Sequence, residues 1–86
     1  MSKVSVVVVS WNVREQLRAC LQSLWAALPS EVIVVDNNSQ DGSAQMVRRD
    51  FPDVVLLPQS ENCGFARGVN IGIQKSQGEI ILLLNP

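Results

Sequence analysis

Residues 4–9 read Val-Ser-Val-Val-Val-Val, and this stretch decides the fold class of the 86-residue chain. β-branched side chains favour strands, and an apolar run without strict alternation is typical of a strand buried on both faces. Similar strands are predicted at 31–35, 54–57 and 79–84. A sheet that is buried on both faces needs helices on both sides, so the chain is predicted to be α/β.

Helical segments separate these strands. The first has four leucines that share one helical face: Leu17, Leu21, Leu24 and Leu28. Asn12 is expected to cap this helix, with Glu15 completing a capping box, and Pro29 ends it. Further helices are predicted at 43–50 and 64–76. Short connections between alternating strands and helices favour a parallel sheet with right-handed crossovers.

Two features of the helices concern packing. Gly64, Gly68 and Gly72 recur every four residues, although each costs a helix about 1 kcal/mol relative to alanine. This spacing indicates close approach of the last helix to a strand or a ligand. The two tryptophans are interpreted as packing residues, with the Trp11 ring over the sheet edge and Trp25 on the leucine face.

Composition excludes several classes of function. The net charge is −1 without a basic stripe, which argues against nucleic-acid binding. No stretch is long and apolar enough to span a bilayer. Cys20 and Cys63 form no C-x-x-C pair and the chain has no histidine, so neither a zinc site nor histidine chemistry is expected. Free thiols indicate a reducing, cytoplasmic compartment.

Polar residues follow each predicted strand, and ligands of open parallel sheets bind beyond the carboxyl ends of the strands. Four clusters should therefore meet at one edge: residues 10–12, residues 36–39, Glu61 with Asn62, and Asn85. A dinucleotide-binding G-x-G-x-x-G after the first strand is absent, and so is a G-x-x-x-x-G-K-[ST] phosphate loop.

Four ordered motifs carry a resemblance to a known family: 4–12, 34–43 (Val-Val-Asp-Asn-Asn-Ser-Gln-Asp-Gly-Ser), 61–72 (Glu-Asn-Cys-Gly-Phe-Ala-Arg-Gly-Val-Asn-Ile-Gly) and 82–86 (Leu-Leu-Leu-Asn-Pro). Together they resemble a family 2 glycosyltransferase, most closely its rhamnosyltransferase-like branch. The resemblance implies the nucleotide-binding half of a GT-A domain, with a Rossmann-like open parallel sheet of about four strands and three helices.

The resemblance also implies a UDP- or dTDP-sugar donor. The positions that match the donor site are Ser10, Trp11, Asn12, Asp36, Asn38, Asn62, Gly64, Arg67 and Asn70. Asp36 matches the acid that accepts the ring N–H of the base, and the guanidinium of Arg67 suits the diphosphate. The parent enzyme is expected to transfer a sugar to an acceptor hydroxyl with inversion, in the cytoplasm or at the inner face of the membrane.

The match departs from the family at its end. Family members carry Asp-x-Asp after the fourth strand to hold a divalent metal, Mg or Mn, but this chain has Asn85 at the first position and ends at Pro86. The second acid, the catalytic base and the acceptor-binding segment are expected beyond residue 86. Residues 1–86 are therefore interpreted as an N-terminal half-domain that retains nucleotide binding at most, with no catalytic residue and a doubtful metal site.

Simpler interpretations stand beside these roles. Asp36 could brace the turn at 37–43, Asp41 could cap the helix at 43–50, and Arg67 could be a solvated helix residue. Asn62 is expected to be a turn residue or cap first and a pocket residue second. A structural hypothesis also remains, in which the apolar fourth strand lies near a sheet edge and drives homo-oligomerisation. A third hypothesis, another nucleotide-binding α/β protein such as a nucleotidyltransferase, lacks the expected glycine-rich loop.

Overall fold

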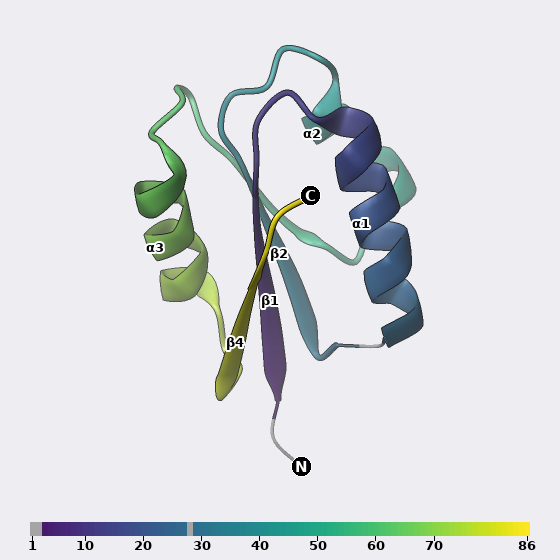
Figure 1. Cartoon of the computed structure of the whole chain (residues 1–86), viewed down its shortest axis with the longest axis vertical. Helices are drawn as coiled ribbons and strands as arrows, with labels where there is room; N and C mark the ends of the chain where they lie inside the picture. Colours follow the sequence, from purple (N-terminus) through teal and green to yellow (C-terminus); the bar gives the residue numbers. More distant parts are fainter. Residues whose placement is uncertain (1–2, 28) are drawn as a thin grey trace.

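The computed structural model describes residues 3–27 and 29–86. Its elements, in chain order, are β1 (Val4–Ser10), α1 (Arg14–Ala27), β2 (Glu31–Asp36), α2 (Ser43–Asp50), β3 (Val55–Pro58), α3 (Phe65–Lys75) and β4 (Ile80–Leu84). The strands form one parallel sheet in the order β3-β2-β1-β4. Figure 1 shows α1 and α2 on one face of this sheet and α3 on the other. The predicted α/β open parallel sheet is confirmed.

Alternate residues of β1 enter two separate cores. Val6 and Val8 pack with Val34 against the helices α1 and α2, where the three buried leucines Leu17, Leu21 and Leu24 meet them. On the opposite face lies a smaller core beneath α3, made by four aliphatic side chains: Val7, Val9, Ile33 and Val35. β1 is thus covered on both faces and flanked by a strand on each side, as its sequence predicts.

The glycines of α3 allow the helix to lie close to the sheet. A Cβ atom at Gly68 would lie 2.8 Å from Cγ1 of Val9, and one at Gly72 would overlap Cγ1 of Val7. The predicted close approach is therefore an approach to strands. Gly64, at the start of the helix, has open space around it and a φ of 84°, so backbone conformation explains that glycine.

The predicted capping of α1 by Asn12 is wrong. Asn12 has a φ of 52°, and its side-chain oxygen accepts a hydrogen bond from the backbone N–H of Gln40 at 2.7 Å. The carboxylate of Asp41 accepts from the N–H of Arg14 instead, at 2.9 Å. Glu15 forms ion pairs with neighbouring arginines rather than closing a capping box. A residue from a distant loop has replaced the local cap.

The tryptophan interpretations are also wrong. The side chain of Trp11 is 53% exposed and that of Trp25 is 60% exposed. Leucines already fill the face of α1 that meets the sheet, and Trp25 lies one position beyond Leu24 at the margin of that face. Trp11 lies beyond the end of β1, past the cores. Leu28, predicted on the same helical face, lies outside the described residues.

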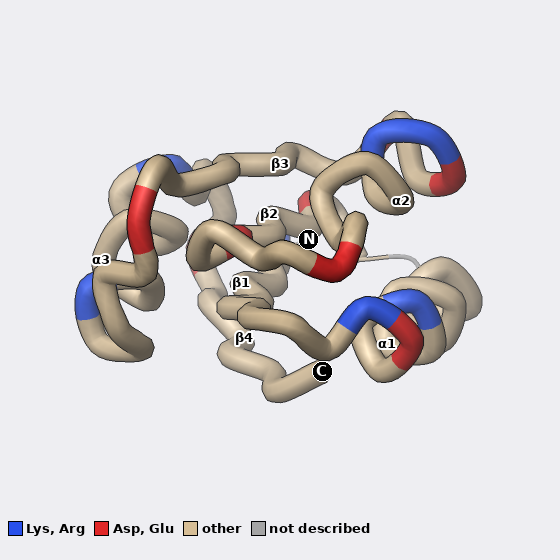
Figure 2. Tube along the Cα trace, turned by 90° about the horizontal axis from the view of Figure 1, so that it is seen from above, with Lys and Arg blue, Asp and Glu red and all other residues tan. Residues whose placement is uncertain are grey.

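β4 forms one edge of the sheet. Its four residues from Ile80 to Leu83 are between 38% and 51% exposed, although all are aliphatic. Seen down the strands in Figure 2, no element of the described chain lies beyond β4. The predicted position of this apolar strand at an edge is confirmed.

Candidate nucleotide site at the carboxyl edge of the sheet

Loops that follow β1, β2 and β3 are joined by hydrogen bonds at the carboxyl edge, onto which Figure 2 looks. The N–H of Asn37 donates to the carbonyl of Ser10 at 2.8 Å, which continues the pairing of β1 and β2 beyond the strands. The N–H of Asn12 donates to Oγ of Ser39 at 2.9 Å. The first two polar clusters predicted from the sequence therefore come together.

Asp36 is the last residue of β2 and is only 2% exposed. Its carboxylate accepts hydrogen bonds from Oγ of Ser39 at 2.7 Å and from the backbone N–H of Ser39 at 3.0 Å. Asp36 therefore does brace the turn that follows it. Each carboxylate oxygen can accept more than one hydrogen bond, so this bracing leaves acceptor capacity for a ligand donor.

Ser10 lies beside Asp36 in the parallel register of β1 and β2, so both side chains are on the same face of the sheet. Its side chain is 1% exposed, and its hydroxyl has no hydrogen-bond partner among the described residues. A buried hydroxyl without a partner costs about 1–3 kcal/mol, and most such groups in native proteins are satisfied. An unpaired donor thus adjoins a buried carboxylate.

Asn37 connects this pair of loops to the third, a role that its sequence context did not reveal. It is 2% exposed, and its side-chain N–H donates to the carbonyl of Gly64 at 3.1 Å. Its side-chain oxygen accepts from the N–H of Cys63 at 3.3 Å. From the sequence, Asn37 was placed only within the polar cluster 36–39, and its contacts could not be read from neighbouring residues because the partners are 26 and 27 residues away.

Three predicted site residues shape these loops. Asn62 accepts the N–H of Gly64 at 2.9 Å, which confirms its role as a turn residue before α3. Asn38 is exposed with a φ of 62°, a left-handed conformation that asparagine tolerates. Gly64 lies immediately before α3 and contacts Asn37, so it belongs to the joined loops.

Arg67 and Asn70 lie on α3, and both are exposed. Gly68 and Gly72 mark the face of α3 that meets the sheet, and Asn70 lies about 200° around the helix from each of them. The structure therefore places Asn70 on the far face of α3, away from the joined loops. Arg67 lies at the side of the first turn, nearer to the carboxyl edge.

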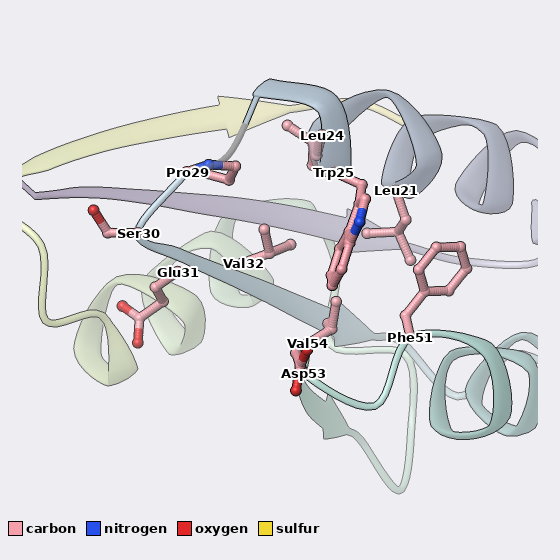
Figure 3. A pocket seen from close by; sticks show the side chains of 10 residues that line it. All are labelled: Leu21, Leu24, Trp25, Pro29, Ser30, Glu31, Val32, Phe51, Asp53 and Val54. Atoms are coloured by element: carbon pink, nitrogen blue, oxygen red, sulfur yellow. The ribbon is translucent and has the colours of Figure 1, made fainter.

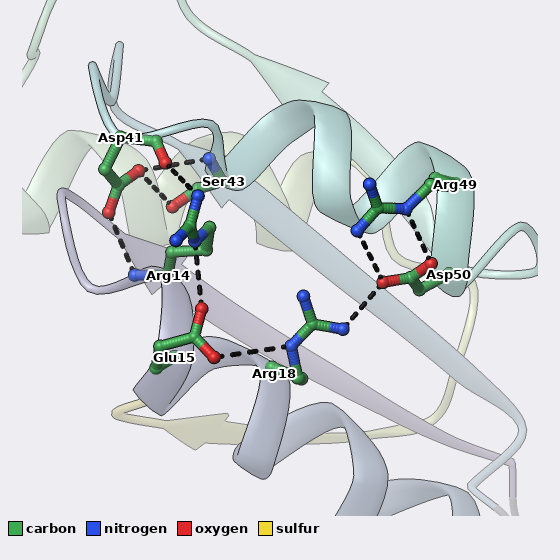
Figure 4. Close-up of polar contacts among 7 residues, drawn as sticks. All are labelled: Arg14, Glu15, Arg18, Asp41, Ser43, Arg49 and Asp50. Carbon is green, nitrogen blue, oxygen red and sulfur yellow. Dashed lines mark hydrogen bonds and ion pairs between the residues drawn. The ribbon is translucent and has the colours of Figure 1, made fainter.

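Asp41 joins the N-termini of α1 and α2, as Figure 4 shows. One carboxylate oxygen accepts from Arg14, and the other accepts from the N–H and Oγ of Ser43, the latter at 2.6 Å. Partial desolvation opposes ionisation of Asp41, but these hydrogen bonds outweigh it and hold the pKa of the carboxyl below its ordinary value. Gly42, rather than the predicted Asp41, occupies the N-cap position of α2 and makes no side-chain cap hydrogen bond. Asp41, one residue earlier, accepts from the first N–H group of α2 and also from that of α1.

A second group of charges holds α1 and α2 together further along (Figure 4). The guanidinium of Arg18 contacts the Asp50 carboxylate at 2.6 Å, and Arg49 contacts it at 2.9 Å. Hydrogen bonds from Arg49 and Arg18 lower the pKa of Asp50 well below its ordinary value. These exposed ion pairs orient α1 and α2, which support the loops. The pairs themselves do not lie in the candidate site.

Asn85, the predicted metal-side residue, does not join the three connected loops. It lies in a shallow depression beside Gln16 and Cys20 of α1. In the described part of the chain, no three His, Cys, Asp or Glu residues are placed to hold a metal ion together. One exposed carboxamide is a weak ligand for Mg²⁺ or Mn²⁺, so the described residues do not by themselves fit a divalent-metal site.

A pocket of about 230 Å³ lies elsewhere, between α1 and the amino ends of β2 and β3. Figure 3 shows Trp25 and Phe51 on one side of it and Glu31 at its far end. It lies at the opposite end of the strands from Asp36, so its lining residues are not part of the candidate site.

Across the described residues, no helix has both the length and the apolar character needed to cross a bilayer.

Comparisons with known proteins agree with this architecture. The chain is 32% identical over 89 residues to the glycosyltransferase AglE of Haloferax volcanii, covering 95% of this chain and 29% of AglE. It is 37% identical over 67 residues to the N-acetylglucosaminyl-diphospho-decaprenol L-rhamnosyltransferase of Mycobacterium tuberculosis, covering 76% of this chain and 22% of that enzyme. The chain thus spans less than a third of the length of these relatives.

Solved structures share the fold. TarS of S. aureus superposes with a TM-score of 0.85 at 27% identity, over 96% of this chain and 27% of TarS. Mannosyl-3-phosphoglycerate synthase of Rubrobacter xylanophilus, at 19% identity, gives a TM-score of 0.78 over 98% of this chain and 30% of that protein, which shows likeness of fold alone. The model of "Glycosyl transferase family 2" matches residues 5–86, and the chain therefore belongs to glycosyltransferase family 2, with the GT-A fold.

Proposed function

We propose that residues 1–86 form the N-terminal, nucleotide-sugar-binding half of a glycosyltransferase domain, with the base of a UDP- or dTDP-sugar at the ends of β1 and β2. The observation that carries this proposal is the buried pair of Ser10 and Asp36, whose polar atoms retain unused hydrogen-bonding capacity. Membership of family 2 makes a nucleotide-sugar the expected ligand class.

The chemistry of this pair suits uracil or thymine. The buried carboxylate of Asp36 is an acceptor, and it complements the ring N–H that these two bases share. The Ser10 hydroxyl can donate to a ring carbonyl oxygen. Cytosine has an acceptor nitrogen in place of that N–H, so it would leave the carboxylate opposed by a second acceptor.

Most of the remaining predicted residues lie in the loops around this pair, but Asn70 lies on the far face of α3 and is not part of the proposed site. Trp11 offers an exposed aromatic face at the end of β1 on which a base can stack. Asn12 and Asn38 shape the two loops, while Asn62, Gly64 and Asn70 belong to the third loop and α3. Arg67 is an exposed cation near the start of α3, where a diphosphate would also meet the helix N-terminus.

The activity proposed for the whole protein is transfer of a sugar to an acceptor hydroxyl by a single inverting displacement, in the cytoplasm. Within this chain, Ser10, Asp36 and Arg67 would bind and orient the donor, and none would exchange protons with the acceptor. No step is assigned to a metal, because Asn85 alone does not provide a site for one.

Nucleotide titration followed by NMR tests the binding proposal. UDP and dTDP should shift the backbone amides around Asp36 and Arg67, whereas CDP, which has the same diphosphate, should bind more weakly. Asp36→Asn should abolish the preference for UDP over CDP, and Asp53→Asn, at the other end of the strands, should leave it unchanged. Equal affinity of the parent chain for UDP and CDP would contradict the role of Asp36.

A second candidate function is structural. We propose that the 86-residue chain forms homo-oligomers through β4, supported by the exposure of its aliphatic side chains on both faces of the sheet. Sedimentation velocity over a range of concentrations tests this, and a monomer at the highest concentration would contradict it. Self-association and nucleotide binding use different edges of the sheet, so neither result determines the other.

A further inference from the structure

The two parts of the proposed donor site lie on opposite faces of the sheet. Successive side chains of a strand point to opposite faces, so Ser10 and Asp36 continue the rows of Val8 and Val34, which pack against α1 and α2. Arg67 belongs to α3, which covers the other face (Figure 1). A nucleotide that contacts both parts must therefore cross the carboxyl edge of the sheet.

Asn37 lies at this edge, between the two parts. Its backbone N–H donates to the carbonyl of Ser10 at 2.8 Å, so it follows directly on the paired strands β1 and β2. Its side chain turns to the face opposite that of Asp36, toward α3. A Cβ atom at Gly68 would lie 3.5 Å from Nδ2 of Asn37, which places this amide beneath the first turn of α3.

The amide of Asn37 binds both residues that precede α3. Its Nδ2 donates to the carbonyl of Gly64 at 3.1 Å, and its Oδ1 accepts from the backbone N–H of Cys63 at 3.3 Å and from the thiol of Cys63 at 3.0 Å. Because Asn37 is only 2% exposed, water competes little for these hydrogen bonds. Gly68 and Gly72 determine how closely α3 approaches the sheet, whereas Asn37 determines where the helix begins.

We propose that Asn37 is a positioning residue for the donor, which aligns Arg67 with the pair of Ser10 and Asp36 so that the guanidinium meets the diphosphate when the base is bound. This inference rests on the proposed function and adds the residue that couples its two parts. Arg67 follows Gly64 by three residues, within the first helical turn, so a displacement of Gly64 moves Arg67 with it. In the described part of the chain Arg67 forms no ion pair, so its guanidinium is available to an anion.

Comparison of uridine with UDP tests this role, because uridine has the base without the diphosphate. By NMR titration, Asn37→Ala should leave the Kd of uridine within about twofold and weaken UDP by about tenfold, the loss expected for a hydrogen bond to a charged group. Ser5→Ala is the matched control. Ser5 is also buried, and its hydroxyl joins Glu31 to the N–H of Gly78 at the amino ends of the strands. This control should lower stability without changing either affinity.

A double-mutant cycle tests whether Asn37 acts through Arg67. Arg67→Ala should itself weaken UDP by about tenfold, and adding Asn37→Ala should then cost less than about threefold more, whereas independent roles would multiply to about a hundredfold. A milder pair of variants leaves the amide in place. Cys63→Ala removes only the thiol donor and should weaken UDP by about two- to threefold, and Cys63→Ser, whose hydroxyl can donate to the same oxygen, should restore it.

The outcomes separate this inference from the proposed function. If Asn37→Ala weakened uridine and UDP equally, left both unchanged, or multiplied with Arg67→Ala, the positioning role alone would be overturned. If Asn37→Ala did not fold, the Cys63 variants would decide, and equal UDP affinity of Cys63→Ala and the parent would overturn the role. If the parent chain bound neither UDP nor uridine, the proposed function would be overturned as well.

Discussion

β1 and β4 lie side by side and are built from the same kind of sequence, yet they have opposite environments. Val6 and Val8 are at most 1% exposed, whereas Leu82 and Leu83 are each 46% exposed. Val6 and Leu82 are even direct neighbours in the ladder, on the same face. A run of aliphatic residues therefore predicts a strand, whereas the burial of its side chains depends on the neighbouring strands and on the helices that cover them.

The ends of the two strands differ as well. The loop after β1 is joined to the next loop through Asn37, Ser39 and Gln40. Beyond β4, Asn85 only borders a shallow depression on α1. Among the described residues, the carboxyl end of β1 is therefore held in a hydrogen-bonded network, and no such network includes the end of β4.

The strongest test of this comparison places a carboxylate on each strand. Val6→Asp should cost at least about 3 kcal/mol in the free energy of unfolding, because the charge would be buried in the larger core without a partner. Leu82→Asp should cost less than about 1 kcal/mol, because water reaches this position. Urea unfolding followed by circular dichroism at low protein concentration measures both. Similar costs would show that the two strands are equally buried in solution.

The second prediction concerns the packing of α3 against β1. Gly72→Ala should destabilise the chain by about 1–3 kcal/mol, because the new methyl group would overlap Val7 and push α3 off the sheet. The gain in helix propensity, about 1 kcal/mol, acts in the opposite direction. Gln74→Ala, at an exposed position of the same helix, is the control and should be neutral or stabilising. If both variants were more stable than the parent, α3 would not pack as closely against Val7 as described.

A third prediction addresses the loop network by its pH dependence. The pKa of Asp41 is lowered on folding, so its contribution is present above the ordinary value of 3.8 and is lost as the pH falls through the lowered folded value. Asp41→Asn should therefore be less stable than the parent by about 1 kcal/mol at pH 6, with a smaller difference below about pH 3. Thermal unfolding at several pH values measures this, with Asp53→Asn as the control. If the difference in stability between Asp41→Asn and the parent did not change with pH, the loss would come from altered hydrogen-bond geometry rather than from the charge of Asp41.

The smallest effect is expected on the uncovered side of β4. Leu83→Thr keeps a side chain that suits a strand and should change the free energy of unfolding of the monomer by about 0.5 kcal/mol or less. Chemical denaturation of a dilute sample measures it. A loss of more than about 2 kcal/mol would mean that Leu83 is packed against other side chains and would weaken the contrast with β1.

Much of the candidate site could be predicted from the residues that follow each strand. Ser10 and Asp36 were expected to lie near each other because parallel strands end at a common edge, and the structure places them side by side in the register. The position of Asn70 on the far face of α3 could not be read from the motif. The motif gives the order of residues, whereas the helix face depends on how Gly68 and Gly72 seat α3 on the sheet.

The sequence by itself determined the order of strands and helices, because β-branched runs, leucine spacing, prolines and glycines act through near neighbours in the chain. Only the tertiary structure decided that Asp41, rather than Asn12, caps α1 and that Asn37 fastens α3, because each contact spans about 27 residues. It also decided how far the exposed fractions of β1 and β4 differ. The burial of a strand depends on how many strands flank it and how many helices cover it. Two strands of similar hydrophobicity can therefore differ in burial, and their own residues do not show which of them is covered.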